Sequence, residues 1–119
     1  MCPTKLILII DDDADILNIL QGVLEAEGYQ IVTSVVANGL PPPELHPDLI
    51  LLDVMLSGNE NGLEVCQKLK QQVRTQRIPV VLMSAHASLK TMATGLADAC
   101  LTKPFDLDTL YYIVEAQLS

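Results

Sequence analysis

Short apolar runs recur along the chain, and segments with helical periodicity separate them. In the first run, Leu6-Ile7-Leu8-Ile9-Ile10, most residues are β-branched and no polar residue alternates with the apolar ones. Such a run predicts a strand that is buried on both faces, as in parallel sheets covered by helices. Further strands are expected at Gln30–Val36, Asp48–Asp53, Val80–Ser84 and Cys100–Thr102. This repetition constrains the fold more than any other feature of the sequence.

Helical periodicity predicts three strong helices at residues 14–27, 62–73 and 107–118, and a weak one at 89–96. The expected inward faces are Ile16, Leu20, Val23 and Leu24 in the first, Leu63, Cys66, Leu69 and Val73 in the second, and Leu107, Leu110, Val114 and Leu118 in the last. Gly28 suits the turn after the first helix, and Asp106 suits the N-cap of the last. Pro41-Pro42-Pro43 falls where another helix is expected, so that helix should be stunted or replaced by a loop.

These elements predict an α/β fold in which a βα unit is repeated five times. The result would be a single parallel five-stranded sheet with helices on both faces, built by one domain over residues 1–119. The sequence has 15 acidic and 7 basic residues and a net charge of −8. This balance argues against direct binding of nucleic acid or of an anionic membrane, because phosphates are bound by clustered Lys and Arg.

The remaining bulk features predict a cytoplasmic protein. No apolar run approaches the length of a membrane span, and the first residues lack the pattern of a signal peptide. The three cysteines, Cys2, Cys66 and Cys100, do not have the spacing of metal ligands. We therefore expect reduced thiols rather than disulfides or a zinc site.

Polar residues gather where the predicted strands end. Asp11-Asp12-Asp13 follows the first strand, Asp53 ends the third, Ser84 ends the fourth, and Lys103 follows the fifth. Ligands of such sheets bind beyond the carboxyl ends of the strands. Crowded carboxylates repel each other, and a hard divalent cation bound by oxygen ligands would compensate their charge. Each residue alone also suits a strand stop, a turn or a surface charge, but their coincidence at one edge predicts a functional site.

With these residues in place, the chain resembles the receiver domain of two-component response regulators. The matching segments, in the order found in the family, are LILIIDDDADIL at 6–17, PDLILLDVML at 47–56, PVVLMSA at 79–85 and LTKPFD at 101–106. The resemblance implies a flavodoxin-like fold and a phosphoryl-accepting signalling switch. It also implies two kinds of partner, namely a sensor histidine kinase or phosphotransfer protein, and an output domain or protein that the switch controls.

The resemblance implies roles for the acidic residues. Asp53 would accept the phosphoryl group from a kinase histidine, and the cofactor would be Mg²⁺. Asp12, Asp53 and the backbone carbonyl of Met55 would ligate this ion, and Asp11 would support it through water. Mg²⁺ suits such a site because it takes a few carboxylates, keeps several waters and holds phosphate oxygens.

The resemblance also implies roles for the residues that contact the phosphoryl group. Lys103 would neutralise its oxygens, and Ser84 would hydrogen-bond it. A cis peptide bond is expected between Lys103 and Pro104, since X–Pro bonds adopt the cis form most readily. The domain would not be an enzyme beyond catalysing its own phosphorylation and dephosphorylation.

Four other residues near the predicted site have separate interpretations. We expect Asp13 to cap the following helix rather than to bind the metal. Met55 and His86 occupy positions that flank the phosphoryl group in the family and tune its lifetime, although His86 equally suits an exposed loop. His46, between Leu45 and Pro47, is expected to be a loop residue.

The sequence departs from the family away from the site. The loop over residues 53–62 has Ser57 where proline is usual and is longer than normal, and Glu60 adds charge. The segment between Ser84 and Lys103 is shorter than in the family, which predicts a truncated fourth helix region. Cys100 replaces the aromatic residue that normally lies before the lysine. We therefore expect any phosphorylation signal to leave by a surface other than the family's usual output face.

Three other functions compete with the signalling switch. A phosphate-independent docking or dimerisation module with a receiver-like fold would keep the fold and lose the chemistry. A haloacid-dehalogenase-type phosphatase would explain Asp11-Asp12-Asp13, but Asp15 stands where that motif requires Thr or Val. A dinucleotide-binding domain would need a glycine-rich turn after the first strand, which the sequence lacks.

Overall fold

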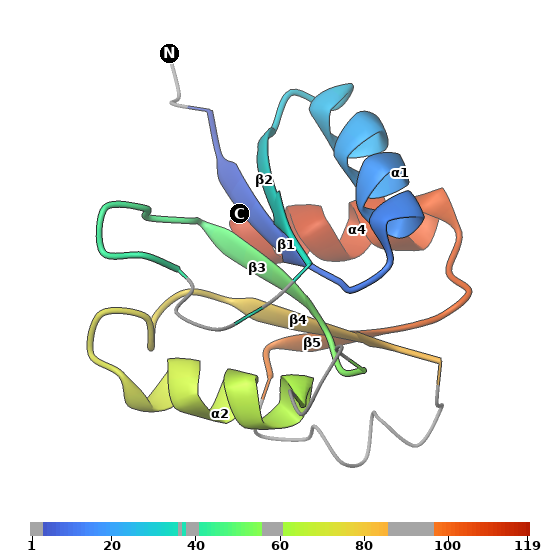
Figure 1. Ribbon diagram of the computed structural model, residues 1–119. Coiled ribbons are helices and arrows are strands. Elements are labelled where there is room, and N and C mark those ends of the chain that lie inside the picture. The colour runs from blue at the N-terminus through green and yellow to red at the C-terminus, as the bar shows by residue number, and fades with distance from the viewer. Residues whose placement is uncertain (1–3, 36, 38–40, 56–60, 86–96) are drawn as a thin grey trace.

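The computed structural model describes residues 4–35, 37, 41–55, 61–85 and 97–119. Its strands are β1 (Leu6–Ile10), β2 (Gln30–Ser34), β3 (Leu49–Asp53), β4 (Val80–Ser84) and β5 (Ala99–Thr102). The helices of these residues are α1 (Ala14–Glu25), α2 (Gly62–Gln71) and α4 (Leu107–Leu118) (Figure 1). None of these three helices is long and apolar enough to cross a membrane.

The five strands form one parallel sheet in the order β2-β1-β3-β4-β5. β1 lies between β2 and β3, since Ile7 pairs with Ile31 of β2 on one side and with Leu49 of β3 on the other. α1 and α4 cover one face of the sheet and α2 covers the other (Figure 1). The predicted parallel α/β architecture is therefore confirmed.

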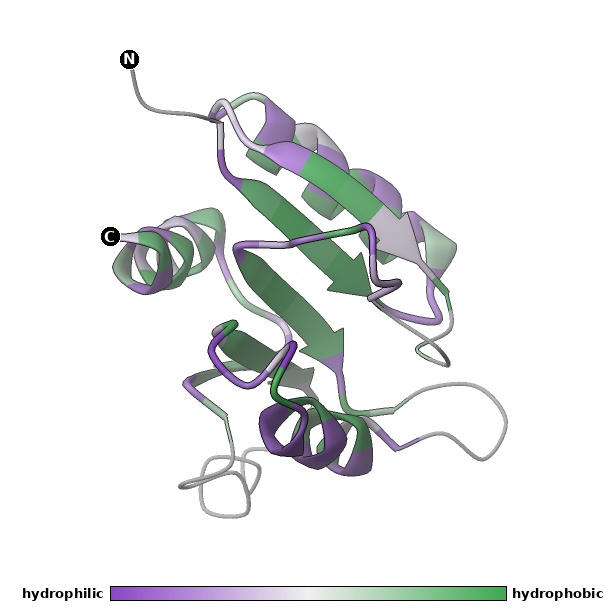
Figure 2. Cartoon of the chain, turned by 90° about the vertical axis from the view of Figure 1, so that its left-hand side faces the viewer, coloured by the Kyte–Doolittle hydropathy of each residue, from purple (hydrophilic) through white to green (hydrophobic). Residues whose placement is uncertain are grey.

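The core consists of two aliphatic layers, one on each face of the sheet. Alternate residues of β1 illustrate the division, since Ile7 and Ile9 pack toward α1 and α4, whereas Leu8 and Ile10 pack toward α2. β3 and β4 are buried along their whole length, as their unbroken apolar runs predict. The strands are accordingly the most hydrophobic part of the chain, and the helices carry their polar residues outward (Figure 2).

Some predicted boundaries differ from the structure. β2 ends at Ser34, before the predicted Val36. α2 ends at Gln71, and the extended backbone of Gln72 (ψ 132°) takes Val73 out of the helical pattern. Val73 is 86 % exposed, so its predicted inward position is wrong. Leu107 is also exposed, because it lies at the first position of α4, where the chain only begins to turn toward the core.

Other expectations are confirmed or fall outside the described residues. Gly28 follows α1 with a positive φ of 96°, a conformation that glycine adopts without a steric penalty. Asp106 caps α4 by accepting a hydrogen bond from the Thr109 N–H at 2.7 Å. The helix predicted at residues 89–96, with its shortening, lies outside the described residues.

The segment between β2 and β3 contains no helix in its described residues, as the three prolines predict. Arg74, which follows α2, donates hydrogen bonds to the backbone carbonyls of Pro41 at 2.9 Å and Pro42 at 3.3 Å. Leu45 packs against the core on the α2 side of the sheet. A loop anchored by one arginine thus takes the place of a helix beside β1 and β2.

Candidate functional site

The predicted site residues meet at the carboxyl edge of the sheet. Asp11 directly follows β1, Asp53 is the last residue of β3, Ser84 is the last of β4, and Lys103 directly follows β5. The first three are buried, because each continues a strand that lies inside the core. The Lys103 N–H donates to the Ser84 carbonyl at 2.7 Å, which extends the pairing of β4 and β5 into the site.

Lys103 bridges two of the carboxylates. Its Nζ lies 2.8 Å from Asp11 Oδ2 and 3.6 Å from Asp53 Oδ1. The peptide bond between Lys103 and Pro104 is cis, as expected. Burial alone would lower the pKa of Lys103, but the hydrogen bond to Asp11 and the charges of Asp53 and Asp11 outweigh it, so the pKa is raised. The lysine therefore carries its positive charge at neutral pH.

Among the residues that the structure describes, one ammonium group faces three carboxylates at this edge. Asp11, Asp12 and Asp53 each offer an oxygen within 4.8 Å of the others. The pKa of Asp53 is raised from 3.8 to about 6, first because the carboxyl is buried and then because Asp11 is close. The charge of Lys103 and the Met55 N–H act in the opposite direction without cancelling the effect. The site therefore has an excess of negative charge that its own lysine does not neutralise.

The three carboxylates fit a hard cation such as Mg²⁺, which prefers oxygen ligands and carries the charge that the site lacks. Asp12 is exposed, so its carboxylate can reach a hydrated ion. Asp11 already accepts hydrogen bonds from Lys103 on one oxygen and from the Asp13 N–H, at 3.0 Å, on the other. The donor set is thus compatible with Asp12 and Asp53 as ligands and with Asp11 in a supporting position.

Met55 lies two residues after Asp53, just beyond the end of β3. Its N–H lies 3.4 Å from Asp53 Oδ1, and its side chain is exposed. Met55 also forms an isolated antiparallel bridge with Asn61, which closes the loop that follows the site. The ligand role expected for its carbonyl stays a prediction.

The third aspartate of the triplet is a helix cap, as predicted. Asp13 Oδ1 accepts hydrogen bonds from the N–H groups of Asp15 at 2.9 Å and Ile16 at 3.4 Å, at the start of α1. His46 is exposed in the loop before β3, also as predicted. His86, Ser57 and Glu60 lie outside the described residues.

Gly62 is a site residue that the sequence reasoning did not identify. Its N–H donates to the Val54 carbonyl at 2.8 Å, so the first residue of α2 lies directly against the end of β3. A Cβ at this position would collide with the backbone carbonyl of Asp53. The only signal in the sequence is a glycine directly after Asn61, which caps α2 through a 2.8 Å hydrogen bond from the Leu63 N–H.

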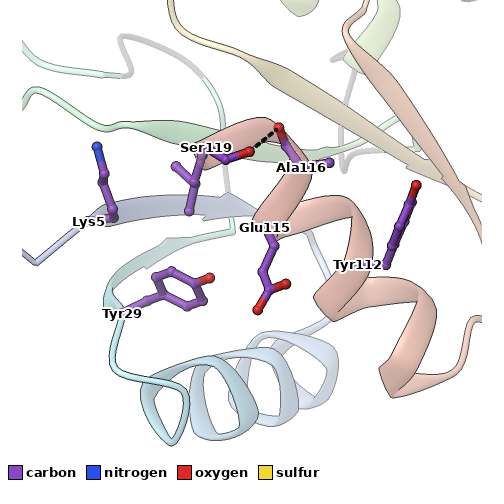
Figure 3. Close-up of a pocket in the computed structure, with 7 residues that line it drawn as sticks. Lys5, Tyr29, Tyr112, Glu115, Ala116 and Ser119 are labelled. Atoms are coloured by element: carbon purple, nitrogen blue, oxygen red, sulfur yellow. Dashed lines mark hydrogen bonds between the residues drawn. The ribbon is translucent and has the colours of Figure 1, made fainter.

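A hollow of about 530 Å³ lies at the opposite, amino edge of the sheet (Figure 3). Its lining includes Lys5, which precedes β1, and the Glu115 side chain lies between Tyr29 and Tyr112 (Figure 3). Burial, Glu115 and Glu27 together raise the pKa of Tyr29. This hollow contains neither Lys103 nor the aspartates that lie near it, so the candidate chemistry belongs to the carboxyl edge.

Comparison with known proteins matches residues 7–115 to the response regulator receiver domain. The chain belongs to this family. A receiver domain of a two-component system accounts for the parallel five-stranded sheet and for the acidic residues at its carboxyl edge. The family assignment made from the sequence is confirmed.

Individual relatives support the assignment. The chain is 38% identical over 117 residues to the DNA-binding dual master transcriptional regulator RpaA of Synechocystis sp. (strain ATCC 27184 / PCC 6803 / Kazusa), with 94% of this chain and 48% of RpaA covered. It thus spans about half the length of the relatives that it matches. The crystal structure of the receiver domain of NtrX from Brucella abortus has a TM-score of 0.83 and 30% identity, and the match covers 94% of this chain and 97% of that domain.

A third match shows the fold alone. The receiver domain of the sensor histidine kinase PA1611 from Pseudomonas aeruginosa PAO1 has a TM-score of 0.85 and 18% identity, and the match covers 98% of each chain. That structure has a magnesium ion coordinated in its active site cleft. RpaA is named as a DNA-binding protein, but this chain corresponds to only part of it, so the prediction that the receiver domain itself does not bind nucleic acid is not tested by this likeness.

Proposed function

We propose that this receiver domain is a phosphoryl-accepting switch in a cytoplasmic phosphorelay. Asp53 would take a phosphoryl group from a phosphohistidine of a sensor histidine kinase or of a phosphotransfer protein. The observation that carries the proposal is the position of Lys103, whose Nζ lies 2.8 Å from Asp11 and 3.6 Å from Asp53 at the edge of a carboxylate cluster. This arrangement provides a nucleophile together with a cation for the transferred group.

In the proposed step, an Asp53 carboxylate oxygen forms a bond to phosphorus while the bond from phosphorus to the donor imidazole nitrogen breaks. A pKa of about 6 leaves most of Asp53 ionised at pH 7, as the attack requires. Such transfers depend on positioning and on neutralising charge more than on covalent help from the protein. Lys103 would neutralise a phosphoryl oxygen, and Ser84 would hydrogen-bond another. The domain would turn over only its own phosphoryl group and would not be an enzyme for other substrates.

We assign Mg²⁺ as the cofactor. Asp12, Asp53 and the Met55 carbonyl would hold it, and Asp11 would support it through water. When bound, it would supply positive charge to the phosphoryl oxygens and to the excess of carboxylates. The support is the donor set of three carboxylates, together with the pKa of Asp53, which burial and then the nearby Asp11 raise to about 6.

The partner would dock beside the site on an apolar groove of about 350 Å³. The groove is lined by Ile16, Ile19, Leu20, Ala85, Lys103, Pro104, Phe105 and Leu107. Ile19 of α1 and Leu107 of α4 are exposed there although both are large and apolar. Because Lys103 belongs to both the groove and the site, a protein seated here could present a histidine to Asp53.

The chemistry is tested by incubating the protein with acetyl phosphate and Mg²⁺ and measuring its intact mass. We expect phosphorylation of the wild type and of Asp15→Asn, which changes an exposed carboxylate in the first turn of α1. Asp53→Asn should abolish the labelling. A wild type that neither binds Mg²⁺ nor becomes labelled would refute the proposal and favour the phosphate-independent docking or dimerisation module.

The docking surface is tested separately. Ile19→Glu should slow transfer from a phosphorylated histidine phosphotransfer protein while leaving labelling by acetyl phosphate unchanged. Val73→Glu is the matched control, because Val73 is also an exposed apolar residue but lies after α2, outside the groove. Equal effects of the two substitutions on transfer would count against this docking surface.

The output route is a further part of the proposal. Cys100 on β5 packs against the core layer that contains α2, and it occupies the position where the family usually has an aromatic residue. A small side chain cannot swing between two positions as a large ring can. We expect beryllofluoride to change the chemical shifts of Asp53 and Ser84 more than those of β5; strong shifts throughout β5, as in relatives with the aromatic residue, would contradict this route.

A further inference from the structure

β2 is one of the two edge strands of the sheet, β5 being the other, and no described strand lies beyond it. The Gln30 N–H donates to the Lys5 carbonyl, and the Ser34 carbonyl accepts from the Asp11 N–H, so these residues face β1. Hydrogen bonding alternates along a strand, and Ile31 and Thr33 therefore direct their N–H and carbonyl groups away from β1. The outer edge of β2 thus presents a row of donors and acceptors to a further strand.

This edge lacks the features that usually protect one. Edge strands avoid pairing with other chains through charged residues, proline or bulges. The sequence of β2, Gln-Ile-Val-Thr-Ser, has neither charge nor proline, and three of its five residues are β-branched. A hollow of about 580 Å³ lies along Gln30, Ile31 and Val32, bounded by Leu6, Tyr29, Leu45 and one charged residue, Glu25 of α1. Among the described residues, the edge is therefore open to an approaching strand.

We propose that β2 pairs with β2 of a second copy of this chain, antiparallel and about a two-fold axis at Val32. Ile31 of each copy would then face Thr33 of the other and exchange both backbone hydrogen bonds with it. The two Val32 side chains would meet at the axis, on the face of the sheet where a loop replaces a helix. The two five-stranded sheets would become one continuous sheet.

The flanking pairs agree with the same register. Gln30 of one copy would lie opposite Ser34 of the other, and Tyr29 opposite Val35. Val35 is exposed in the single chain, and Tyr29 is half-buried, so their pairing would cover an apolar side chain. Cross-strand pairs of an aromatic and a β-branched residue are favourable. Every pair from Tyr29 to Val35 would be uncharged.

Charge favours this surface over others as a contact between copies. The chain carries a net charge of −8, which opposes association of two copies, and acidic residues within a contact would add to that repulsion. Pairing through β2 places uncharged residues opposite uncharged residues. In a two-fold arrangement the β2 edges of both copies are hydrogen-bonded to each other, so the assembly closes as a dimer. The inference does not depend on phosphorylation of Asp53 and goes beyond the proposed function.

The first test compares the masses of the 119-residue chain and its variants by sedimentation over a concentration series reaching the millimolar range. The wild type should form a dimer in a concentration-dependent manner. Thr33→Pro should be monomeric, because it removes an outward N–H but none of the hydrogen bonds to β1. Thr33→Val keeps the N–H and should still dimerise. Circular dichroism would verify that each variant is folded.

The second test determines the register. In a background of Cys2→Ser, Cys66→Ala and Cys100→Ala, Val32→Cys places two thiols opposite each other in a pair whose Cα atoms are about 4.5 Å apart, a distance that a disulfide tolerates. Glutathione disulfide should oxidise them to a linked dimer while it is reduced to two thiols. Gln30→Cys should link far more slowly, because Gln30 faces Ser34. The inference is overturned if the wild type is monomeric throughout, if Thr33→Pro dimerises like the wild type, or if Gln30→Cys links as fast as Val32→Cys.

Discussion

Two lysine–aspartate pairs of nearly equal length lie at opposite edges of the sheet. At the carboxyl edge, Lys103 Nζ lies 2.8 Å from Asp11; at the amino edge, Lys70 Nζ lies 2.7 Å from Asp98. The two lysines are equally exposed, at 22% and 23%, whereas Asp11 is 0% exposed and Asp98 is 39% exposed. The contacts look alike, but their surroundings differ.

The pair at the amino edge is balanced. Lys70 also donates to the Ile78 carbonyl at 2.8 Å, and Asp98 also accepts from the Val80 N–H at 2.8 Å. One positive charge meets one negative charge, and each of the two side chains also forms a hydrogen bond with one backbone group. This pair therefore ties α2 to the start of β4 and to the residue before β5, and its role is structural.

The pair at the carboxyl edge is not balanced, because Lys103 serves both Asp11 and Asp53 while Asp12 lies close by. Burial of the carboxyl is the first cause that raises the pKa of Asp53, and the nearby Asp11 adds to it. A partly buried cluster with surplus negative charge is unfavourable for folding alone, and it is suited to receiving a cation and a phosphoryl group. Charge balance around the salt bridge, rather than its length, distinguishes the pair at the carboxyl edge from the pair at the amino edge.

The largest expected difference between the pairs is in reactivity. Lys103→Met should slow phosphorylation of Asp53 by acetyl phosphate by about 100-fold or more, because a preorganised positive group at the transferred phosphoryl is lost. Lys70→Met should leave the rate unchanged, since Lys70 lies at the other edge of the sheet. The rates are measured from intact mass over time in saturating Mg²⁺. Equal slowing by both substitutions would mean that the two pairs do not differ in the way described.

Stability should separate the pairs in a second way. Without Mg²⁺ at pH 7, Lys103→Met should lower the free energy of unfolding by about 3–5 kcal/mol, because it leaves the buried Asp11 unpaired. Lys70→Met should cost about 1 kcal/mol, since Asp98 keeps the Val80 N–H and contact with water. Urea unfolding measures both. Adding Asp11→Asn to Lys103→Met should recover part of the loss; if it deepens the loss instead, the unpaired charge is not its cause.

Much of the carboxyl edge could be predicted from the sequence because it depends on local patterns. An unbroken apolar run marks a buried strand, and the residue after it must lie at the edge of the sheet. This reasoning placed Asp11, Asp53, Ser84 and Lys103 together, and helix capping separated Asp13 from them. The family resemblance added the roles that geometry alone leaves open.

The balanced pair and the close backbone contact could not be predicted in this way. Lys70 and Asp98 are 28 residues apart, and nothing in either local pattern identifies the partner. Gly62 matters because α2 starts against the Asp53 carbonyl, a contact that exists only after the loop closes. The inward position predicted for Val73 was wrong for a related reason. The hydrophobic periodicity continues past Gln71, where the helix ends.

Removing one negative charge should stabilise the protein at the carboxyl edge and destabilise it at the amino edge. The pKa of Asp53 in the folded protein, about 6, lies above its ordinary value of 3.8, so the contribution of this carboxyl to stability falls as the pH rises between these values. Asp53→Asn should therefore stabilise the Mg²⁺-free protein by up to about 3 kcal/mol above pH 6, with little effect near pH 4. Asp98→Asn should destabilise it at pH 7, because the Lys70 pair is lost. Urea unfolding across this pH range tests both signs, and stabilisation by both substitutions would contradict the comparison.

The smallest expected effect tests whether backbone position matters at the carboxyl edge in addition to charge. Gly62→Ala places a Cβ against the Asp53 carbonyl and should cost about 1–3 kcal/mol of stability, with slower labelling by acetyl phosphate, because the end of β3 must move. Gly22→Ala is the matched control, since a Cβ there meets nothing within 4 Å and alanine favours the interior of α1 by up to about 1 kcal/mol. It should raise stability and leave labelling unchanged. Gly62→Ala could instead lower stability and leave labelling at the wild-type rate. In that case charge alone would determine the reactivity of the carboxyl edge, and the contact between Gly62 and the Asp53 backbone would serve stability only, as the Lys70–Asp98 pair does.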